Sequence, residues 1–199
     1  MHAQAKVTLA ELKDCLQAEY IGDKKPFSWL RLFHRVFFCQ RSRYLFWWRV
    51  AQYFYFSPHR FLHKLGIRIG ASNNRKYCND ISLKTRIGKG LSLPHPIGIV
   101  LTNYCQLGEY VTIMQGVTIG VKEKGGKANI QVGDHVYIGC NSSIIGGEIN
   151  IGDNAIIGAH ALVLKDVGER LSVYHESDCG YQADINAEQM LMRKVLNNY

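Results

Sequence analysis

The sequence predicts a mainly β protein: a left-handed parallel β-helix of hexapeptide repeats, with an α-helical region before it and a short helix after it. Two observations carry this prediction. Between residues 87 and 163 an aliphatic residue returns at almost every sixth position, and glycine often follows it. Short parallel strands along the sides of a triangular prism would place each sixth residue in a narrow core, with small residues at the corners. Antiparallel strands would instead alternate with a period of two.

The repeat falls into two blocks. The first block contains Ile87, Leu93, Ile99, Cys105, Val111 and Val117, and the second contains Val132, Ile138, Ile144, Ile151, Ile157 and Val163, with one extra residue after Ile144. Three hexads make a coil of eighteen residues, so we expect Asp80 to stack against Gly98. Residues 121–129 interrupt the repeat, and we expect them to bulge from the prism wall, where functional residues often gather.

The chain divides into three regions in this interpretation. Residues 1–79 form a helical, basic and aromatic region, residues 80–170 form the β-helix, and residues 171–199 form a tail with a helix.

Helix signals locate the elements of the first region. Thr8 and Glu11 form a capping box that predicts a helix over residues 9–20. One or two helices follow over residues 28–54. A short helix near residues 60–65 is expected to end at Gly66, before a transition into the prism.

Composition places bounds on the cellular context. A chain of 199 residues with 47% hydrophobic residues can bury a core. Its six cysteines form no CxxC pair, which fits a reducing compartment. The sequence shows no signal peptide and no apolar run long enough to span a bilayer. These features predict a cytoplasmic protein, with peripheral contact at the inner membrane face as a variant.

The positive charge is concentrated in one segment. Residues 24–76 hold twelve of the 24 Lys and Arg residues together with many aromatic residues. None of residues 24–79 is acidic. Such a segment suits a helix on an anionic membrane, with Arg41, Arg43 and Arg49 at the surface. The favoured alternative is that the aromatics form a helical core or a subunit interface. Nucleic acid is not an expected partner, because no recognised motif accompanies the charge.

The prism sequence also carries a motif resemblance. It rests on Asp80, Ile81, Ile87-Gly88, Gly90, Leu93, His95, Gly98-Ile99-Val100, Gln115, Val117-Thr118, Gly120, Ile138-Gly139, Ile151-Gly152 and Ile157-Gly158-Ala159. Over residues 80–165 this pattern resembles the catalytic stretch of bacterial serine acetyltransferases. The spacing from Asp80 to His95, followed by Gly-Ile-Val, is its most specific part.

The resemblance implies that His95 is the general base and that Asp80 orients it. An alcohol is a poor nucleophile at neutral pH, so a neutral imidazole is needed to accept its proton as it attacks an acetyl thioester. Acetyl-CoA is the implied co-substrate. Backbone N–H groups near Gly120 are expected to stabilise the thioester oxygen.

Further site residues follow from the same resemblance. Those expected at acetyl-CoA are Gly120, Lys122, Lys124, Lys127, Gly139, Ala159 and Lys165; those expected at the acceptor are Pro94, Gln115 and Asn129. No metal is expected, since no two histidines of the prism lie within five residues of each other. The family also implies a homotrimer or a dimer of trimers, with sites between subunits.

Two departures from the family pattern bear on the acceptor. Pro94 stands where serine acetyltransferases usually have an acidic residue, and Ala128-Asn129 stands where they have an Arg-His pair. The sequence therefore predicts an O-acetyltransferase whose acceptor hydroxyl belongs to a small molecule or glycan, with a sugar of a surface polysaccharide favoured. The alternatives are a serine O-acetyltransferase of cysteine biosynthesis and a non-catalytic β-helix scaffold.

Overall fold

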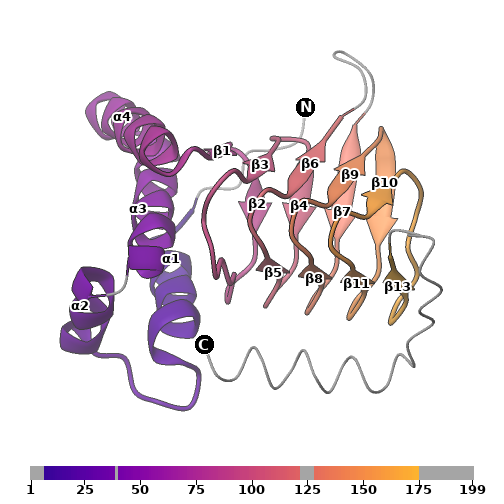
Figure 1. The fold of residues 1–199 in the computed structure, drawn as a ribbon. Coiled ribbons are helices and arrows are strands. Elements are labelled where there is room, and N and C mark those ends of the chain that lie inside the picture. The colour runs from indigo at the N-terminus through magenta and orange to yellow at the C-terminus, as the bar shows by residue number, and fades with distance from the viewer. Residues whose placement is uncertain (1–6, 39, 122–127, 175–199) are drawn as a thin grey trace.

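A computed structural model describes residues 7–38, 40–121 and 128–174 of the chain. Helices form a layer at one end of a triangular β-prism, and the coils of the prism follow one another away from that layer (Figure 1). The predicted C-terminal helix and the lysine-rich centre of the loop lie outside the described residues.

The first helix begins as the sequence predicts. Helix α1 (Leu9–Leu16) has its capping box formed, since the Glu11 N–H donates to Thr8 Oγ1 (3.1 Å) and the Thr8 N–H donates to Glu11 Oε2 (2.7 Å). A π-helical turn, η1 (Gln17–Ile21), extends it. Gly22 ends the turn with a φ of +86°, a conformation that glycine adopts without steric cost.

Three longer helices follow: α2 (Trp29–Phe38), α3 (Gln40–Tyr55) and α4 (Arg60–Tyr77). The prediction that Gly66 ends a short helix is wrong, because α4 continues for a further eleven residues. Gly66 instead permits a close crossing of α3. A Cβ at this position would lie 2.6 Å from the Tyr55 nitrogen and 2.7 Å from the Ala51 oxygen. In the described part of the chain, no helix is long and apolar enough to cross a membrane.

Three parallel sheets form the walls of the prism. The first wall contains β1 (Asp80–Ile81), β3 (Val100–Leu101), β6 (Thr118–Gly120), β9 (Ser143–Ile145) and β12 (Leu162–Val163). The second wall contains β2 (Arg86–Ile87), β4 (Cys105–Leu107), β7 (Asn129–Val132) and β10 (Glu148–Ile151). The third wall contains β5 (Thr112–Ile113), β8 (Tyr137–Ile138), β11 (Ile156–Ile157) and β13 (Ser172–Val173). The predicted parallel β-helix with an N-terminal helical region is confirmed.

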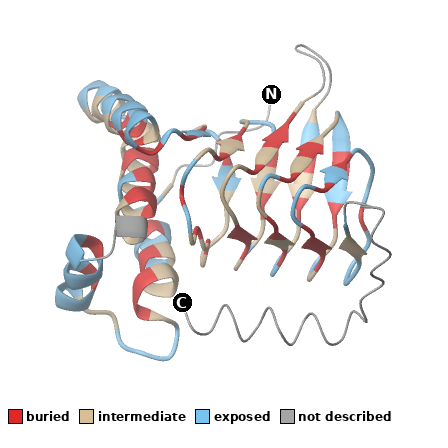
Figure 2. Ribbon diagram, in the orientation of Figure 1, coloured by how far each residue is buried: buried red, intermediate tan, exposed pale blue. Residues whose placement is uncertain are grey.

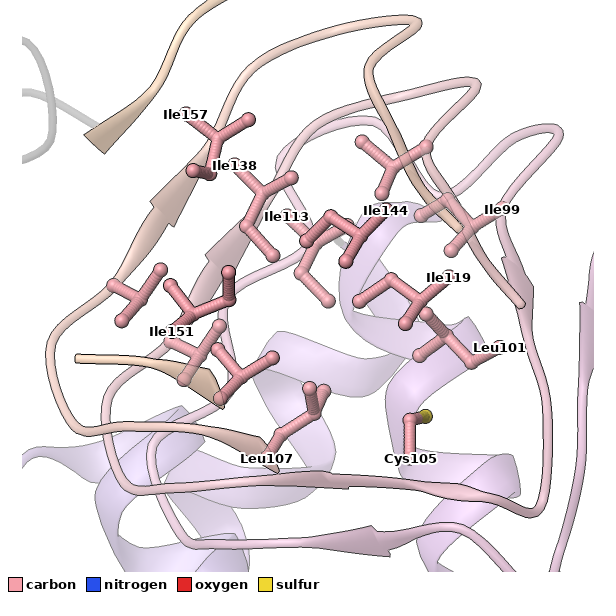
Figure 3. Close-up of a cluster of buried hydrophobic side chains, with 14 of the residues drawn as sticks. Ile99, Leu101, Cys105, Leu107, Ile113, Ile119, Ile138, Ile144, Ile151 and Ile157 are labelled. Carbon is pink, nitrogen blue, oxygen red and sulfur yellow. The ribbon is translucent and has the colours of Figure 1, made fainter. Parts of the chain in front are cut away.

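Each wall turns two residues of a hexad inward, two positions apart. Ile99 and Leu101 are both buried, as are Cys105 and Leu107, and the aliphatic side chains fill the narrow interior (Figure 3). Cys105 stacks on Ile130, whereas Leu107 stacks on Val132. The repeat seen in the sequence therefore follows one inward position in most of the first block and the other in the second.

The coils differ in length. Ile81 pairs with Leu101, twenty residues later, whereas Val100 pairs with Thr118, eighteen residues later. The expectation that Asp80 stacks against Gly98 is wrong, because Asp80 pairs with Val100. The cause is a corner, residues 94–98, that is two residues longer than a regular hexad corner.

The helical layer covers the open edge of the first coil. Arg49 donates to the carbonyl oxygens of Ile87 (2.9 Å) and Gly88 (2.6 Å). Gln52 and Trp48 donate to further carbonyls of the coil, those of Leu83, Thr85 and Ile81. An exposed edge of unpaired backbone groups would invite pairing with another chain, so these contacts protect it.

Arg49 also forms a buried ion pair with Glu19, with 2.6 Å between Nη2 and Oε1. Burial raises the pKa of Glu19, and the guanidinium opposes that rise. The expectation that Arg49 lies at a membrane surface is therefore wrong. The arginine is inside the molecule because its charge has a carboxylate partner and its remaining N–H groups have carbonyl partners.

Candidate active site

His95 lies on the long corner where the chain passes from the third wall to the first. We call this edge of the prism, through all coils, the histidine corner. Pro94 and Pro96 flank His95 and fix the backbone φ angles beside it. The Ile97 N–H donates to the His95 carbonyl (2.8 Å), and Gly98 completes the turn with a φ of +69°. The imidazole is exposed, and no described residue forms a hydrogen bond with it.

Asn79 holds this corner from beneath. Its Nδ2 donates to the Pro96 carbonyl (3.0 Å), and its Oδ1 accepts from the Ile99 N–H (2.8 Å). The side chain is buried, with 8% of the residue exposed. Asn79 thus fixes the backbone on both sides of Ile97 and next to His95. Sequence reasoning missed this residue, although it precedes Ile81 by two positions and so occupies an inward position of its hexad.

Asp80 is exposed on the outer face of β1. Its backbone N–H donates to the Ile99 carbonyl (2.8 Å), which fixes the strand register. Among the described residues, neither a hydrogen bond nor an ion pair joins the Asp80 carboxylate to the His95 imidazole. Burial raises the pKa of Tyr44, and the charge of Asp80 adds to that rise, so the carboxylate acts on the helical layer.

Other predicted residues share the histidine corner. Gln115 follows β5 in the next coil, and its side-chain Oε1 is buried without a hydrogen-bond partner among the described residues. Gly139 and Ala159 follow β8 and β11 at the same edge. They stack closely, since a Cβ on Gly139 would lie 2.5 Å from the Ala159 nitrogen. His95, Gln115, Gly139 and Ala159 therefore form one column.

The other predicted site residues that the structure describes lie at a different edge of the prism. Gly120 ends β6 on the first wall, Asn129 begins β7 on the second wall, and Lys165 follows β12. We call this edge the loop corner. Lys122, Lys124 and Lys127 lie outside the described residues. One face of the prism, about 10 Å for three extended residues, separates the loop corner from the histidine corner.

Gly120 itself is engaged in the sheet. It pairs with Ile145, and its carbonyl accepts from the Gly146 N–H (3.2 Å). The regular alternation of a parallel ladder directs the Gly120 N–H to the neighbouring strand as well. The Gly120 N–H is therefore engaged in the sheet rather than free to stabilise an oxyanion.

Comparisons with known proteins agree with this architecture. No family model matches the chain. A serine acetyltransferase of Staphylococcus epidermidis is 45% identical over 84 residues, which are 41% of this chain and 38% of that protein. One of Staphylococcus aureus is 40% identical over 83 residues, which are 41% of this chain and 38% of that protein. The chain thus matches about two fifths of the length of these relatives.

Solved structures extend the likeness to the helices. Neisseria gonorrhoeae serine acetyltransferase in complex with serine has a TM-score of 0.66 and 28% identity, over 84% of this chain and 66% of that one. The apoenzyme of soybean serine acetyltransferase has a TM-score of 0.68 and 28% identity, over 82% of this chain and 66% of that one. The chain is a serine acetyltransferase-like protein of the left-handed β-helix fold.

Proposed function

We propose that this serine acetyltransferase-like protein transfers an acetyl group from acetyl-CoA to a hydroxyl group, and that the acceptor is serine. The supporting observation is the exposed imidazole of His95 on a rigid, lengthened corner. The chain is also similar to serine acetyltransferases, at 45% identity over 84 residues and, for a solved structure, over 84% of its length.

The reaction assigns one task to His95. As the acceptor oxygen attacks the acetyl carbonyl, the neutral imidazole takes its proton, and the carbon–sulfur bond then breaks. The imidazolium returns the proton to the departing CoA thiolate, so His95 ends the cycle neutral. Asp80 lies one strand below the corner and would stabilise the imidazolium once the corner and the bound acceptor bring the two groups together. Pro94 and Gln115 are the proposed acceptor contacts from this column.

The separation of the two columns supports an assembly of subunits. One chain carries His95 at one corner and the loop residues at another, so the complete set does not meet within one prism. In a homotrimer with walls facing each other, the histidine corner of one subunit faces the loop corner of its neighbour. Lys122, Lys124, Lys127 and Lys165 would then approach the phosphates of acetyl-CoA, and Asn129 would approach the acceptor.

The choice of acceptor departs from the sequence expectation. Pro94 and Ala128-Asn129 favoured a polysaccharide hydroxyl, but the proteins that match this chain are serine acetyltransferases, which support the serine alternative better.

An acceptor screen with labelled acetyl-CoA, comparing serine with nucleotide sugars and oligosaccharides, tests the proposal. We expect label in O-acetylserine, with a KM for serine no higher than about 1 mM, and label formed at least about a hundredfold more slowly by the His95→Ala protein. Label in a sugar and none in serine would reverse the assignment of the acceptor. Label in no acceptor would favour the scaffold alternative.

A further inference from the structure

We propose that helix α2 docks this protein on an anionic membrane surface. The helix exposes five large apolar side chains: Trp29 (57% exposed), Leu30 (81%), Phe33 (45%), Phe37 (70%) and Phe38 (79%). Its residues Leu32 and Val36 are buried in the core of the helical layer. Figure 2 shows a helix that is mainly exposed, with buried residues along one side.

The geometry of an α-helix places these residues on one continuous face. At about 100° per residue, Trp29, Phe33, Phe37 and Leu30 follow directly beside the stripe of Leu32 and Val36. The remaining side carries Arg31, His34 and Arg35, with the exposed Phe38 among them. Only part of the apolar face of α2 therefore packs against the rest of the protein. Helices that lie in a membrane interface have the same arrangement, with aromatic residues toward the lipid and arginines at headgroup level.

Ring contacts pre-arrange the aromatic face. The Phe27 and Trp29 rings meet edge to face with centroids 4.9 Å apart, and Trp29 stacks on Phe33 at 6.0 Å. The Nζ of Lys13 lies 5.0 Å from the centre of the Phe27 ring, at the margin of this face. The rings thus form an ordered strip with a cation beside it.

Positive charge continues beyond the helix. Arg43 donates to the carbonyls of Val36 (3.1 Å) and Phe37 (2.7 Å) at the C-terminal end of α2. The same arginine lines a cavity of about 370 Å³ between α3 and α4, together with Arg68, Lys76 and the rings of Trp47 and Tyr77. No acidic residue lines this cavity. A lipid phosphate has the charge that such a cavity would accept.

Charge complementarity selects a bilayer over a second copy of the chain. Residues 24–79 contain no Asp or Glu. A symmetric contact between two α2 faces would place this positive region against itself. An anionic lipid surface supplies the opposite charge and a place for the aromatic side chains. Because α2 lies on the far side of the helical layer from the prism (Figure 1), the histidine corner would stay in water.

Co-sedimentation of the full chain with lipid vesicles tests the proposal. We expect binding to vesicles of phosphatidylglycerol and phosphatidylcholine, and little binding to phosphatidylcholine alone. Binding should fall as salt approaches about 1 M, where the Debye length is about 3 Å. The triple variant Trp29→Ala, Phe33→Ala, Phe37→Ala should bind at least about tenfold more weakly.

Matched charge variants test whether vesicle binding depends on the α2 surface or only on the positive charge of the whole protein. Arg35→Glu should weaken vesicle binding several-fold. Arg170→Glu, which alters an exposed arginine at the other end of the prism, should leave it unchanged. Light scattering of the triple aromatic variant should show the parental oligomer.

Two results would overturn the proposal. One is an unmodified protein that does not sediment with anionic vesicles. The other is a triple variant whose oligomer dissociates, which would make α2 a subunit interface. Circular dichroism of each variant confirms that it is folded before either result is interpreted.

Discussion

Asn79 forms no hydrogen bond with His95, yet replacing Asn79 with Ala should lower turnover. The substitution removes two hydrogen bonds, those with the Pro96 carbonyl and the Ile99 N–H, and both partners are buried. A buried polar group left without a partner costs about 1 to 3 kcal/mol. Two such groups give an expected loss of about 2 to 6 kcal/mol in the folded state, mostly by loosening of residues 94–99.

A looser corner changes the position of the imidazole. A displacement of about 1 Å in a catalytic group can lower a rate about a hundredfold. We expect Asn79→Ala to reduce kcat by about that factor, whereas the KM for acetyl-CoA should stay within about twofold, because residues of the loop corner bind that co-substrate in our proposal.

Asn73→Ala is the matched control. Asn73 is buried to the same degree, with 7% exposed, and its Nδ2 donates to the Tyr44 carbonyl (2.9 Å) inside the helical layer. Its loss leaves one buried carbonyl without its side-chain donor, so it should lower the free energy of unfolding by about 1 to 3 kcal/mol and leave kcat nearly unchanged. Chemical denaturation gives the stability of both variants, and steady-state kinetics give kcat and KM.

Hydrogen exchange provides a readout that does not depend on activity. The Ile99 amide should exchange faster in Asn79→Ala and at the parental rate in Asn73→Ala. If Asn79→Ala keeps parental turnover while its corner exchanges faster, the position of the corner does not control catalysis and the reasoning fails. If both variants lose turnover equally, Asn79 is only a structural residue.

Two further predictions follow from single side chains. Replacing His95 with Ala should keep the melting temperature close to that of the parent, since the residue is exposed, and should lower turnover about a hundredfold or more; turnover within a few-fold of the parent would reject His95 as the base. The hydrogen bond that Tyr110 donates to Asp23 is the main cause that raises the pKa of Tyr110 to about 12. Because the folded state keeps a proton that the unfolded state loses near pH 10, stability should fall as the pH rises from about 10 to about 12. Urea titrations across that range should show a smaller fall in Tyr110→Phe, and an equal fall would mean that this hydrogen bond does not link the Asp23 segment to the prism.

The prism was predictable because its core repeats. A residue buried on every coil must be apolar, and this constraint appears in the sequence as a period of six. The register within the prism was harder to predict for a specific reason. Leu93 and Ile99 are six residues apart, but they occupy different inward positions, and the two extra residues of the corner hide this change. The sequence therefore shows an unbroken period where the structure has an insertion.

The helical layer shows a different limit of sequence reasoning. The local sequence around Gly66 predicts the end of a helix, yet Gly66 lies inside α4. The glycine is explained by a tertiary contact, the close crossing of α3. The sequence predicts that Arg49 is one more surface charge in a basic segment, yet the residue is buried and contacts Glu19 and two carbonyls of the first coil. In both cases the deciding partner is distant in sequence, so a local pattern does not contain the information.

In our proposal, a change in the regular repeat also marks where the prism functions. Regular hexads supply buried aliphatic residues and paired backbone groups, which leave no reactive side chain in a fixed position. Chemistry requires residues that the ladder does not use, and in our proposal these lie at the two largest changes of coil length: the long corner with His95 and the loop of residues 121–128. Both interruptions border the first wall, on its two opposite edges. Facing walls of neighbouring subunits can therefore join them, and one extra pair of residues at a corner is enough to convert a structural repeat into a candidate site for acyl transfer.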